Sequence, residues 1–198
     1  MSKVLGPWQQ LNCQQVYENP WLRLEHHEVK TPANTAGIYG KICFKNIAVG
    51  IVAIDDEGYT YLVKQYRYPL AQDSWEIPEG GCPLAGNPLD AARRELREET
   101  GLSAVQWFAL QNLHTSNSVT DECAEVFIAA GLSQGKQCLE ATEDIQVARL
   151  PLTEAVAMAL DGRITDAISV AALLKTHILL SQFNGVTKDF FASMPTVS

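Results

Sequence analysis

Short runs of hydrophobic residues, rich in Ile, Val, Phe and Tyr, dominate the first two thirds of the chain and predict β-strands. The turn signal Asp55-Asp56-Glu57-Gly58 separates two of these runs, so a hairpin is expected there. The residues from Asp73 to Gly86 predict a short strand followed by a loop rich in Pro and Gly. Within 16–30, an extended segment is expected after Asn19-Pro20. The other segments expected to be extended lie at 38–54, 59–66, 105–110, 124–130 and 145–150.

The last third of the chain and one segment in its middle show helical spacing instead. In the middle segment, Asn87 can cap a helix, Pro88 suits its first position and Gly101 can end it. Two further helices are expected at 153–160 and 166–182. The apolar face of the middle helix consists of Leu89, Ala92 and Leu96. This order of elements predicts an α/β domain with many strands first and helices late.

At 198 residues, the chain is long enough for one compact domain, or for one domain with a small appendage. Its 23 acidic residues against 15 Lys and Arg residues give a formal net charge of −8, which disfavours binding to nucleic acid or to an anionic membrane. The longest apolar runs fall short of the roughly 20 residues that span a bilayer. Residues 1–15 show no signal peptide, so a cytoplasmic protein is expected. The five cysteines are odd in number and widely spaced, which favours free thiols over disulfides or a zinc site.

The middle helix concentrates acidic residues on one face. Glu95, Glu98 and Glu99 stand at positions i, i+3 and i+4, opposite the apolar stripe, where their charges repel one another. Arg94 stands four residues before Glu98 and can neutralise only part of this charge. A hard divalent cation with oxygen ligands, Mg²⁺ or Mn²⁺, would relieve the rest. The alternative is an ordinary solvated face of a surface helix.

The residues around this helix resemble the Nudix box, G-x5-E-x7-R-E-U-x-E-E-x-G-U, in which U is aliphatic. The segment 80–102 departs from the pattern at Gly86, which stands where the box has its first glutamate. In the family that glutamate organises the loop and pairs with the box arginine, so the resemblance implies that Arg94 lacks its usual partner. We expect metal binding to persist, with an effect on loop rigidity or turnover. The matching positions are Gly80, Arg94, Glu95, Leu96, Glu98, Glu99, Gly101 and Leu102.

Segments outside the box resemble the branch of this family that comprises the ADP-ribose pyrophosphatases. They are 63–69, 75–80, 142–145 and 162–167. The loop after the box departs from that branch, because 116–122 lacks its usual Pro-Gly pair. This departure argues more against ADP-ribose as the substrate than against the general class of nucleoside diphosphates linked to another group. The resemblance implies hydrolysis of a nucleoside diphosphate linked to a sugar, as in ADP-ribose, an ADP-sugar or a GDP-sugar. The products would be a nucleoside monophosphate and a sugar phosphate.

The resemblance also implies a set of metal ligands. Glu95 and Glu99 are the implied direct ligands of Mg²⁺ or Mn²⁺, and Glu98 is a third or bridging ligand. The backbone carbonyl of Glu79 and a loop carboxylate, Glu143, are implied to complete the site.

The catalytic base stays open at this stage. The family position two residues before Glu143 is Ala141 here, which leaves Glu143 itself, Glu140 and a box glutamate, Glu98, as candidates. Arg67 is expected to contact phosphate, the alternative being a plain surface arginine. Trp21 is expected to stack on the nucleobase, the alternative being a core or interface tryptophan. The expected substrate-binding residues are Trp21, Arg67, Glu76, Ser116 and Asn117.

The implied fold is the Nudix α/β/α sandwich with a mixed β-sheet over 46–198, preceded by an N-terminal strand unit over 1–45. In the resembling branch this unit exchanges contacts between protomers, so we expect a homodimer whose small-molecule partner is a nucleoside diphosphate sugar. Two alternatives stay open: a catalytically weak Nudix-fold protein that binds or senses nucleotide sugars, and an interaction module whose acidic helix docks a basic partner. His26 and His27 have no Cys or second His pair at metal spacing and are expected to be surface imidazoles.

Overall fold

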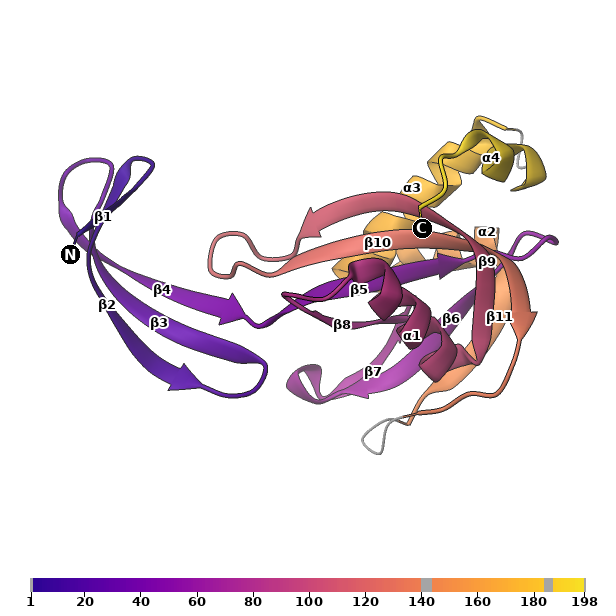
Figure 1. The fold of residues 1–198 in the computed structure, drawn as a ribbon, viewed down its shortest axis with the longest axis horizontal. Coiled ribbons are helices and arrows are strands. Elements are labelled where there is room, and N and C mark those ends of the chain that lie inside the picture. The colour runs from indigo at the N-terminus through magenta and orange to yellow at the C-terminus, as the bar shows by residue number, and fades with distance from the viewer. Residues whose placement is uncertain (1, 140–143, 184–186, 198) are drawn as a thin grey trace.

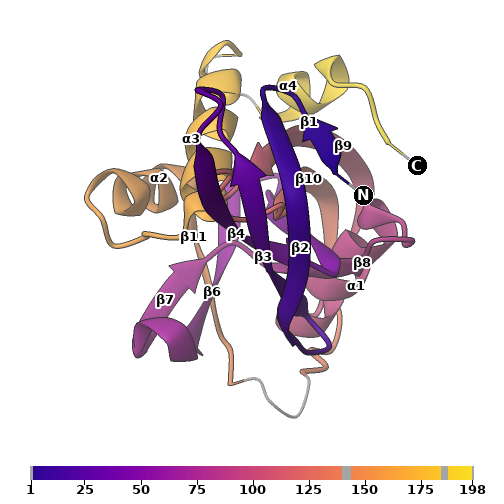
Figure 2. The ribbon, with the colours of Figure 1, turned by 90° about the vertical axis from the view of Figure 1, so that its left-hand side faces the viewer.

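The first four strands form an antiparallel sheet that stands to one side of the rest of the protein (Figure 1). Residues 2–139, 144–183 and 187–197 are described by the structure, a computed structural model. Figure 2 views this N-terminal sheet from its outer side, with the body of the protein behind it. Its strands are β1 (Lys3–Leu5), β2 (Trp8–Glu18), β3 (Leu22–Lys30) and β4 (Ala36–Phe44), in the order β1-β2-β3-β4.

A turn at Asn19 and Pro20 comes just before the extended segment that the sequence predicted after this pair. The side-chain Oδ1 of Asn19 accepts hydrogen bonds from the backbone N–H groups of Trp21 and Leu22, at 2.9 and 2.8 Å. Asparagine commonly ends a strand in this way, and the proline that follows has no N–H to continue the ladder. β3 therefore confirms the extended segment predicted after Asn19-Pro20, and its pairing partners, which the sequence did not show, are β2 and β4.

Two further sheets form the body of the protein. A mixed sheet has the order β8-β5-β10-β9, in which β5 and β10 run parallel, and an antiparallel sheet has the order β11-β6-β7. A short 3₁₀ helix, η1 (Tyr68–Leu70), joins β6 to β7. The strands are β5 (Asn46–Ala53), β6 (Tyr59–Arg67), β7 (Gln72–Glu76), β8 (Glu79–Pro83), β9 (Leu102–His114), β10 (Cys123–Gln134) and β11 (Gln146–Pro151).

The single strand expected at 38–54 is wrong, whereas the hairpin expected with 59–66 has its predicted turn and second strand but is limited to one bridge. β4 ends at Phe44, β5 begins at Asn46, and the two strands belong to different sheets. β5 and β6 meet at the isolated bridge between Ile54 and Thr60 and then diverge into different sheets. The physical reason is burial: residues 49–54 pack alternately into two hydrophobic clusters, so β5 needs a neighbour on each edge and a layer on each face.

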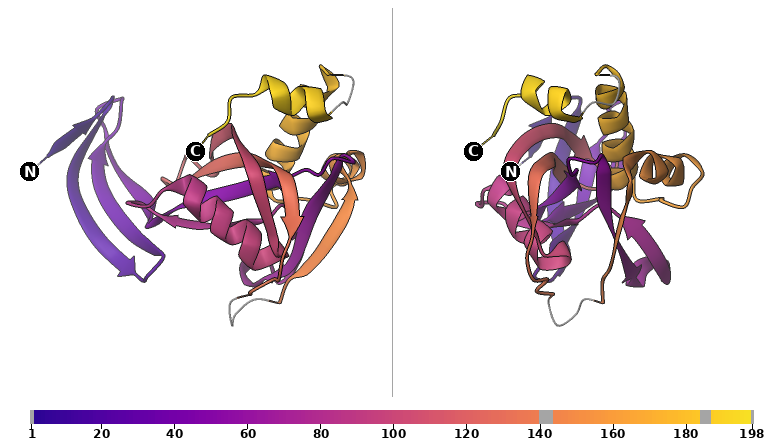
Figure 3. Two further views of the ribbon diagram at one scale, coloured as in Figure 1. Left: turned by 45° about the vertical axis from the view of Figure 1, so that its right-hand side comes forward. Right: turned by 90° about the vertical axis from the view of Figure 1, so that its right-hand side faces the viewer.

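The helices confirm the predicted layering. In α1 (Pro88–Thr100), Asn87 Oδ1 accepts a hydrogen bond from Leu89 N–H at 2.9 Å, and Gly101 ends the helix with a φ of 75°. α1 covers one side of the mixed sheet, and α3 (Ala167–Ser181) covers the other (Figure 3). α2 (Leu152–Leu160) packs against α3 and against β6 and β11 of the antiparallel sheet, and α4 (Thr187–Ser193) packs against α3 and β9. The sequence predicted α2 and α3 but not α4. No helix in the described part of the chain is both long and apolar enough to cross a membrane.

Candidate active site

A pocket of about 770 Å³ lies where the N-terminal sheet meets the body of the protein. Trp21, in the turn between β2 and β3, and Phe44, at the end of β4, line it from the side of the N-terminal sheet. Trp21 is 64% exposed, so it is not the core tryptophan that the sequence left open. The charged residues that line the pocket are Arg67, Glu76, Glu79, Glu122 and Asp166.

Two α1 carboxylates are held against the backbone of β8. Glu99 Oε2 accepts a hydrogen bond from Glu79 N–H at 3.0 Å, and Glu95 Oε1 accepts one from Gly81 N–H at 3.2 Å. Gly80 makes this approach possible, because a Cβ built there would lie 2.1 Å from the Glu95 carboxyl carbon. Both carboxylates are almost fully buried, and their positions follow from the i, i+4 spacing that the sequence showed.

Arg94 has other partners in place of the glutamate that Gly86 replaces. Its guanidinium lies 2.7 Å from Glu98 Oε2 and 2.7 Å from Glu95 Oε1, and it donates to the Gly81 carbonyl at 3.0 Å. Gly86 N–H itself donates to a backbone carbonyl at 2.7 Å in the turn that precedes α1. Arg94 thus couples two box carboxylates to β8 without a loop glutamate.

Arg67 and two carboxylates form the centre of the pocket wall. Arg67 Nε donates to Glu76 Oε1 at 2.9 Å, and its Nη2 lies 2.6 Å from Glu79 Oε1. Burial opposes the charge on Arg67, but the hydrogen bond and the charge of Glu76 outweigh it and raise the pKa of Arg67 above its usual value. Gln65 also donates to Glu76, at 3.2 Å. Arg67 is therefore a paired pocket arginine, not the plain surface arginine that was the alternative.

Negative charge exceeds positive charge in this region. Burial, followed by the charges of Asp166 and Glu76, raises the pKa of Glu79 well above its usual value, although Arg67 acts in the opposite direction. Burial likewise raises the pKa of Glu95. Glu79 Oε2 is buried and finds no hydrogen-bond partner among the residues that the structure describes. The two arginines, Arg67 and Arg94, face six carboxylates: Glu76, Glu79, Glu95, Glu98, Glu99 and Asp166.

These residues fit a hard divalent cation. The buried orphan oxygen of Glu79 and the clustered carboxylates supply the oxygen ligands that Mg²⁺ and Mn²⁺ prefer. Backbone N–H groups hold the carboxylates of Glu95 and Glu99 in place, so their positions are fixed before a cation binds.

The other predicted site residues are not among the described residues that line the pocket. Ser116 and Asn117 lie in a turn in which the Ser116 carbonyl accepts hydrogen bonds from Val119 N–H and Thr120 N–H, and they stand beside the lining residue Thr115. Neither is among the lining residues of the pocket as described, so their substrate contacts stay a prediction. Glu140 and Glu143 lie outside the described residues.

Neither Asp166 nor Glu122 was assigned to the site from the sequence. Asp166 caps α3 by accepting a hydrogen bond from Ser169 N–H at 2.7 Å, and it lines the pocket beside Glu79. The motif 162–167 was noted as similar to the branch, and that was the one signal pointing to it. Glu122 lines the pocket and accepts a hydrogen bond from the Thr115 hydroxyl, which the polar composition of this loop did not reveal.

Comparison with protein families agrees with this geometry. The model of the NUDIX domain matches residues 44–173, which include α1 and every described carboxylate of the pocket. The chain belongs to the Nudix family. It is a Nudix hydrolase, as the box predicted. A second model, the nucleoside diphosphate sugar hydrolase N-terminal domain, matches residues 8–42, the region of β2 to β4.

Several proteins are similar to this Nudix hydrolase in sequence. A protein of Mycobacterium tuberculosis named ADP-ribose pyrophosphatase is 38% identical over 139 residues, which cover 69% of this chain and 67% of the relative. One of Bacillus subtilis with the same name is 34% identical over 64% of this chain and 69% of the relative. A methanol dehydrogenase activator of Bacillus methanolicus is 31% identical over 82% of this chain and 89% of the relative.

A solved structure shares the fold. A crystal structure described as an ADP compounds hydrolase matches with a TM-score of 0.82 at 22% identity, over 93% of this chain and all of that chain. At this level of identity the match confirms the fold alone.

Proposed function

We propose that this Nudix hydrolase is a Mg²⁺-dependent pyrophosphohydrolase that cleaves a nucleoside diphosphate sugar to a nucleoside monophosphate and a sugar phosphate. One observation carries the proposal: α1 holds Glu95 and Glu99 on the backbone of β8, beside a pocket lined by Arg67 and the exposed ring of Trp21. ADP-ribose, an ADP-sugar and a GDP-sugar all fit this class. Two relatives named ADP-ribose pyrophosphatase support ADP-ribose as the first substrate to test.

The metal would be held by the carboxylates of Glu95 and Glu99, with Glu98 and the backbone carbonyl of Glu79 as further ligands. Bound there, Mg²⁺ would offset the charge of the diphosphate and polarise the attacked phosphorus. Mn²⁺ has the same preference for oxygen ligands and is a second candidate.

The protein groups have separate roles in this proposal. Trp21 offers an exposed aromatic face to the nucleobase. Arg67 offers a guanidinium to the phosphates, and its pairing with Glu76 fixes its orientation in the pocket wall. A carboxylate accepts a proton from the attacking water, with Glu98, Glu140 and Glu143 as the candidates.

A panel of nucleotides tests the proposal. Purified protein is incubated with ADP-ribose, ADP-glucose, GDP-mannose or NADH at several Mg²⁺ and Mn²⁺ concentrations, and the products are separated by chromatography. We expect metal-dependent release of AMP or GMP with an equal amount of the partner phosphate. Binding of a nucleotide sugar without turnover would favour a sensor, and no product with any compound would refute the hydrolase assignment for this class.

We also propose that the protein is a homodimer built through the N-terminal sheet. The sheet exposes several large apolar side chains that a second protomer could cover. They are Val4, Leu5, Leu11, Val16, Tyr17 and Ile38. Sedimentation velocity should give twice the mass of the chain at micromolar concentration, and a single peak at the mass of one chain would contradict the dimer.

A further inference from the structure

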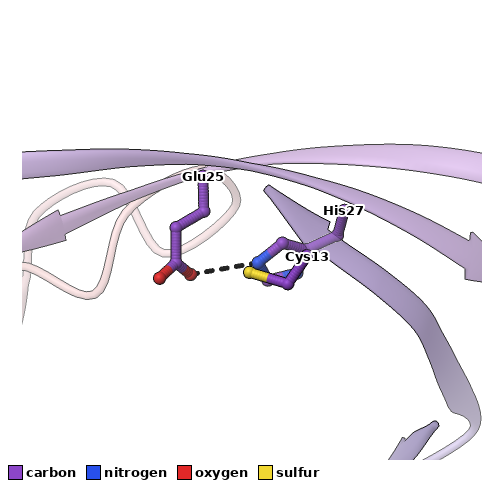
Figure 4. A group of neighbouring side chains, drawn as sticks. All are labelled: Cys13, Glu25 and His27. Carbon is purple, nitrogen blue, oxygen red and sulfur yellow. Dashed lines mark hydrogen bonds and ion pairs between the residues drawn. The ribbon is translucent and has the colours of Figure 1, made fainter. Parts of the chain in front are cut away.

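Three potential metal ligands meet on the N-terminal sheet, away from the pocket. In the register of β2 and β3, Cys13 pairs with His27, and Glu25 stands two residues before His27 on the same face of β3. One ligand atom from each of the three lies within 4.8 Å of the other two. Figure 4 shows the carboxylate, the imidazole and the sulfur converging on one side of the strands.

This arrangement corrects the expectation for His27. His27 is 8% exposed rather than a surface imidazole, and a cysteine does lie beside it. The sequence did not show this, because Cys13 reaches His27 across a strand pair whose register shifts on both sides of the cysteine. Cys13 itself is an exposed free thiol, so the group is open to solvent on one side.

Existing contacts already orient the carboxylate of Glu25. Arg23 Nε donates to its Oε1 at 2.8 Å, while its Oε2 lies 3.0 Å from His27 Nε2. A carboxylate with one oxygen held by arginine and the other close to the imidazole is already oriented, as ligands of metal sites are.

The chemistry of the three donors selects the metal. Thiolate, imidazole and carboxylate are the three ligand types of Zn²⁺, which binds them at about 2.0–2.3 Å in a tetrahedron. Three protein ligands and a water in the fourth position suit a site that is open on one side. Mg²⁺ avoids sulfur ligands, so it does not compete with Zn²⁺ for this group. The carboxylates of the pocket offer no thiolate and so suit Mg²⁺ better than Zn²⁺.

We propose that Cys13, Glu25 and His27 form a Zn²⁺ site that ties β2 to β3, separate from the carboxylate site of the pocket. Binding replaces the proton of the Cys13 thiol and the hydrogen bond between Glu25 and His27, while Arg23 keeps its hold on the other carboxylate oxygen. The site does not depend on the proposed hydrolase activity, because its three residues are absent from the described lining of the pocket.

Co²⁺ serves as the probe, because a thiolate bound to tetrahedral Co²⁺ gives a sulfur-to-metal charge-transfer band. The protein is kept reduced with a phosphine and saturated with Mg²⁺, which occupies the oxygen site. We expect one Co²⁺ per chain with the sulfur band, and bleaching of that band when Zn²⁺ is added. Absence of the band in the wild-type protein would overturn the proposal.

Matched variants identify the residues that bind the Co²⁺ ion. Cys13→Ser should abolish it, whereas Cys138→Ser, at another exposed thiol, should leave it intact. His27→Gln should weaken Co²⁺ binding by at least the roughly 10- to 100-fold that outer-shell partners are worth, and His26→Gln should not. If His27→Gln fails to fold by circular dichroism, Glu25→Gln takes its place. A band that survives Cys13→Ser, or that disappears in Cys138→Ser, would show that the sulfur ligand lies elsewhere.

Discussion

Gly80→Ala is the smallest change that tests the geometry of the carboxylate site. A Cβ at this position would lie 2.1 Å from Cδ and Oε1 of Glu95 and 2.6 Å from Oε2. Heavy atoms do not approach this closely without a bond, so the Glu95 carboxylate has to rotate away from β8. The clash involves the end of a side chain, so we expect the variant to fold while the position of Glu95 changes.

The displaced carboxylate gives up two contacts that hold it in place. They are the hydrogen bonds from Gly81 N–H at 3.2 Å and from Arg94 at 2.7 Å. Hydrogen bonds to a charged group contribute about 1.5–3 kcal/mol each, and Arg94, at 39% exposure, recovers part of its share from water. A net loss of about 2–3 kcal/mol corresponds to a fall of about 30- to 150-fold in Mg²⁺ affinity and in kcat/KM.

Gly81→Ala is the matched control. The nearest atom to a Cβ at Gly81 is the side-chain nitrogen of Asn46, at 3.2 Å, and Glu95 is not among its close neighbours. Mg²⁺ affinity by calorimetry and kcat/KM for the best substrate of the panel are measured for both variants. The reasoning is refuted if Gly80→Ala keeps the wild-type values, or if Gly81→Ala loses as much.

Three further predictions concern groups that hold the pocket in place. Ser169→Ala leaves the buried N–H of Ile77 without its acceptor at 2.9 Å and should cost about 1–3 kcal/mol, measured by urea unfolding. Arg67→Lys keeps the charge but loses the two-pronged contact with Glu76, and kcat/KM should fall about tenfold, the equivalent of about 1.4 kcal/mol. The pKa of Glu79 is raised in the folded protein, so the metal-free wild-type protein should lose stability as pH rises above the ordinary value of 4.5. In EDTA at neutral pH, Glu79→Gln should therefore have a higher melting temperature than the wild type, and this difference should vanish toward pH 4.5.

Each of these predictions has a control and a contradicting outcome. Ser103→Ala, on the exposed side of β9, should leave the unfolding midpoint unchanged. An equal loss of stability in this variant would show that the effect of Ser169→Ala does not come from the hydrogen bond to Ile77. Arg163→Lys, on the surface after α2, should leave kcat/KM unchanged. A melting difference between Glu79→Gln and wild type that is the same at every pH would show that titration of Glu79 is not its cause.

The features that could be predicted from the sequence depend on local interactions. The cap at Asn87, the proline at position 88 and the stop at Gly101 act within one helix, and the structure confirms all three. The i, i+3, i+4 spacing likewise placed Glu95 and Glu99 on one face, because an isolated helix has that geometry already.

The features that could not be predicted depend on tertiary pairing. The apolar run before the turn at Asp55 looks the same whether it pairs with the next strand or lies between β8 and β10. Asp166 reaches the pocket only because α3 packs against the mixed sheet, and Cys13 reaches His27 only through the register of β2 and β3. Neither contact leaves a signal in the spacing of the residues.

Release of nucleoside monophosphate from ADP-ribose and the other nucleotide sugars, measured against Mg²⁺ concentration, tests the central claim most directly. Glu99→Gln keeps the shape of the side chain that accepts from Glu79 N–H but removes its charge, whereas Asp90→Asn removes the same charge from an exposed position of the same helix. We predict saturable, Mg²⁺-dependent release by the wild-type protein and by Asp90→Asn, and its loss in Glu99→Gln. Equal release by all three proteins, or release that is independent of Mg²⁺, would contradict a carboxylate-held metal in this pocket.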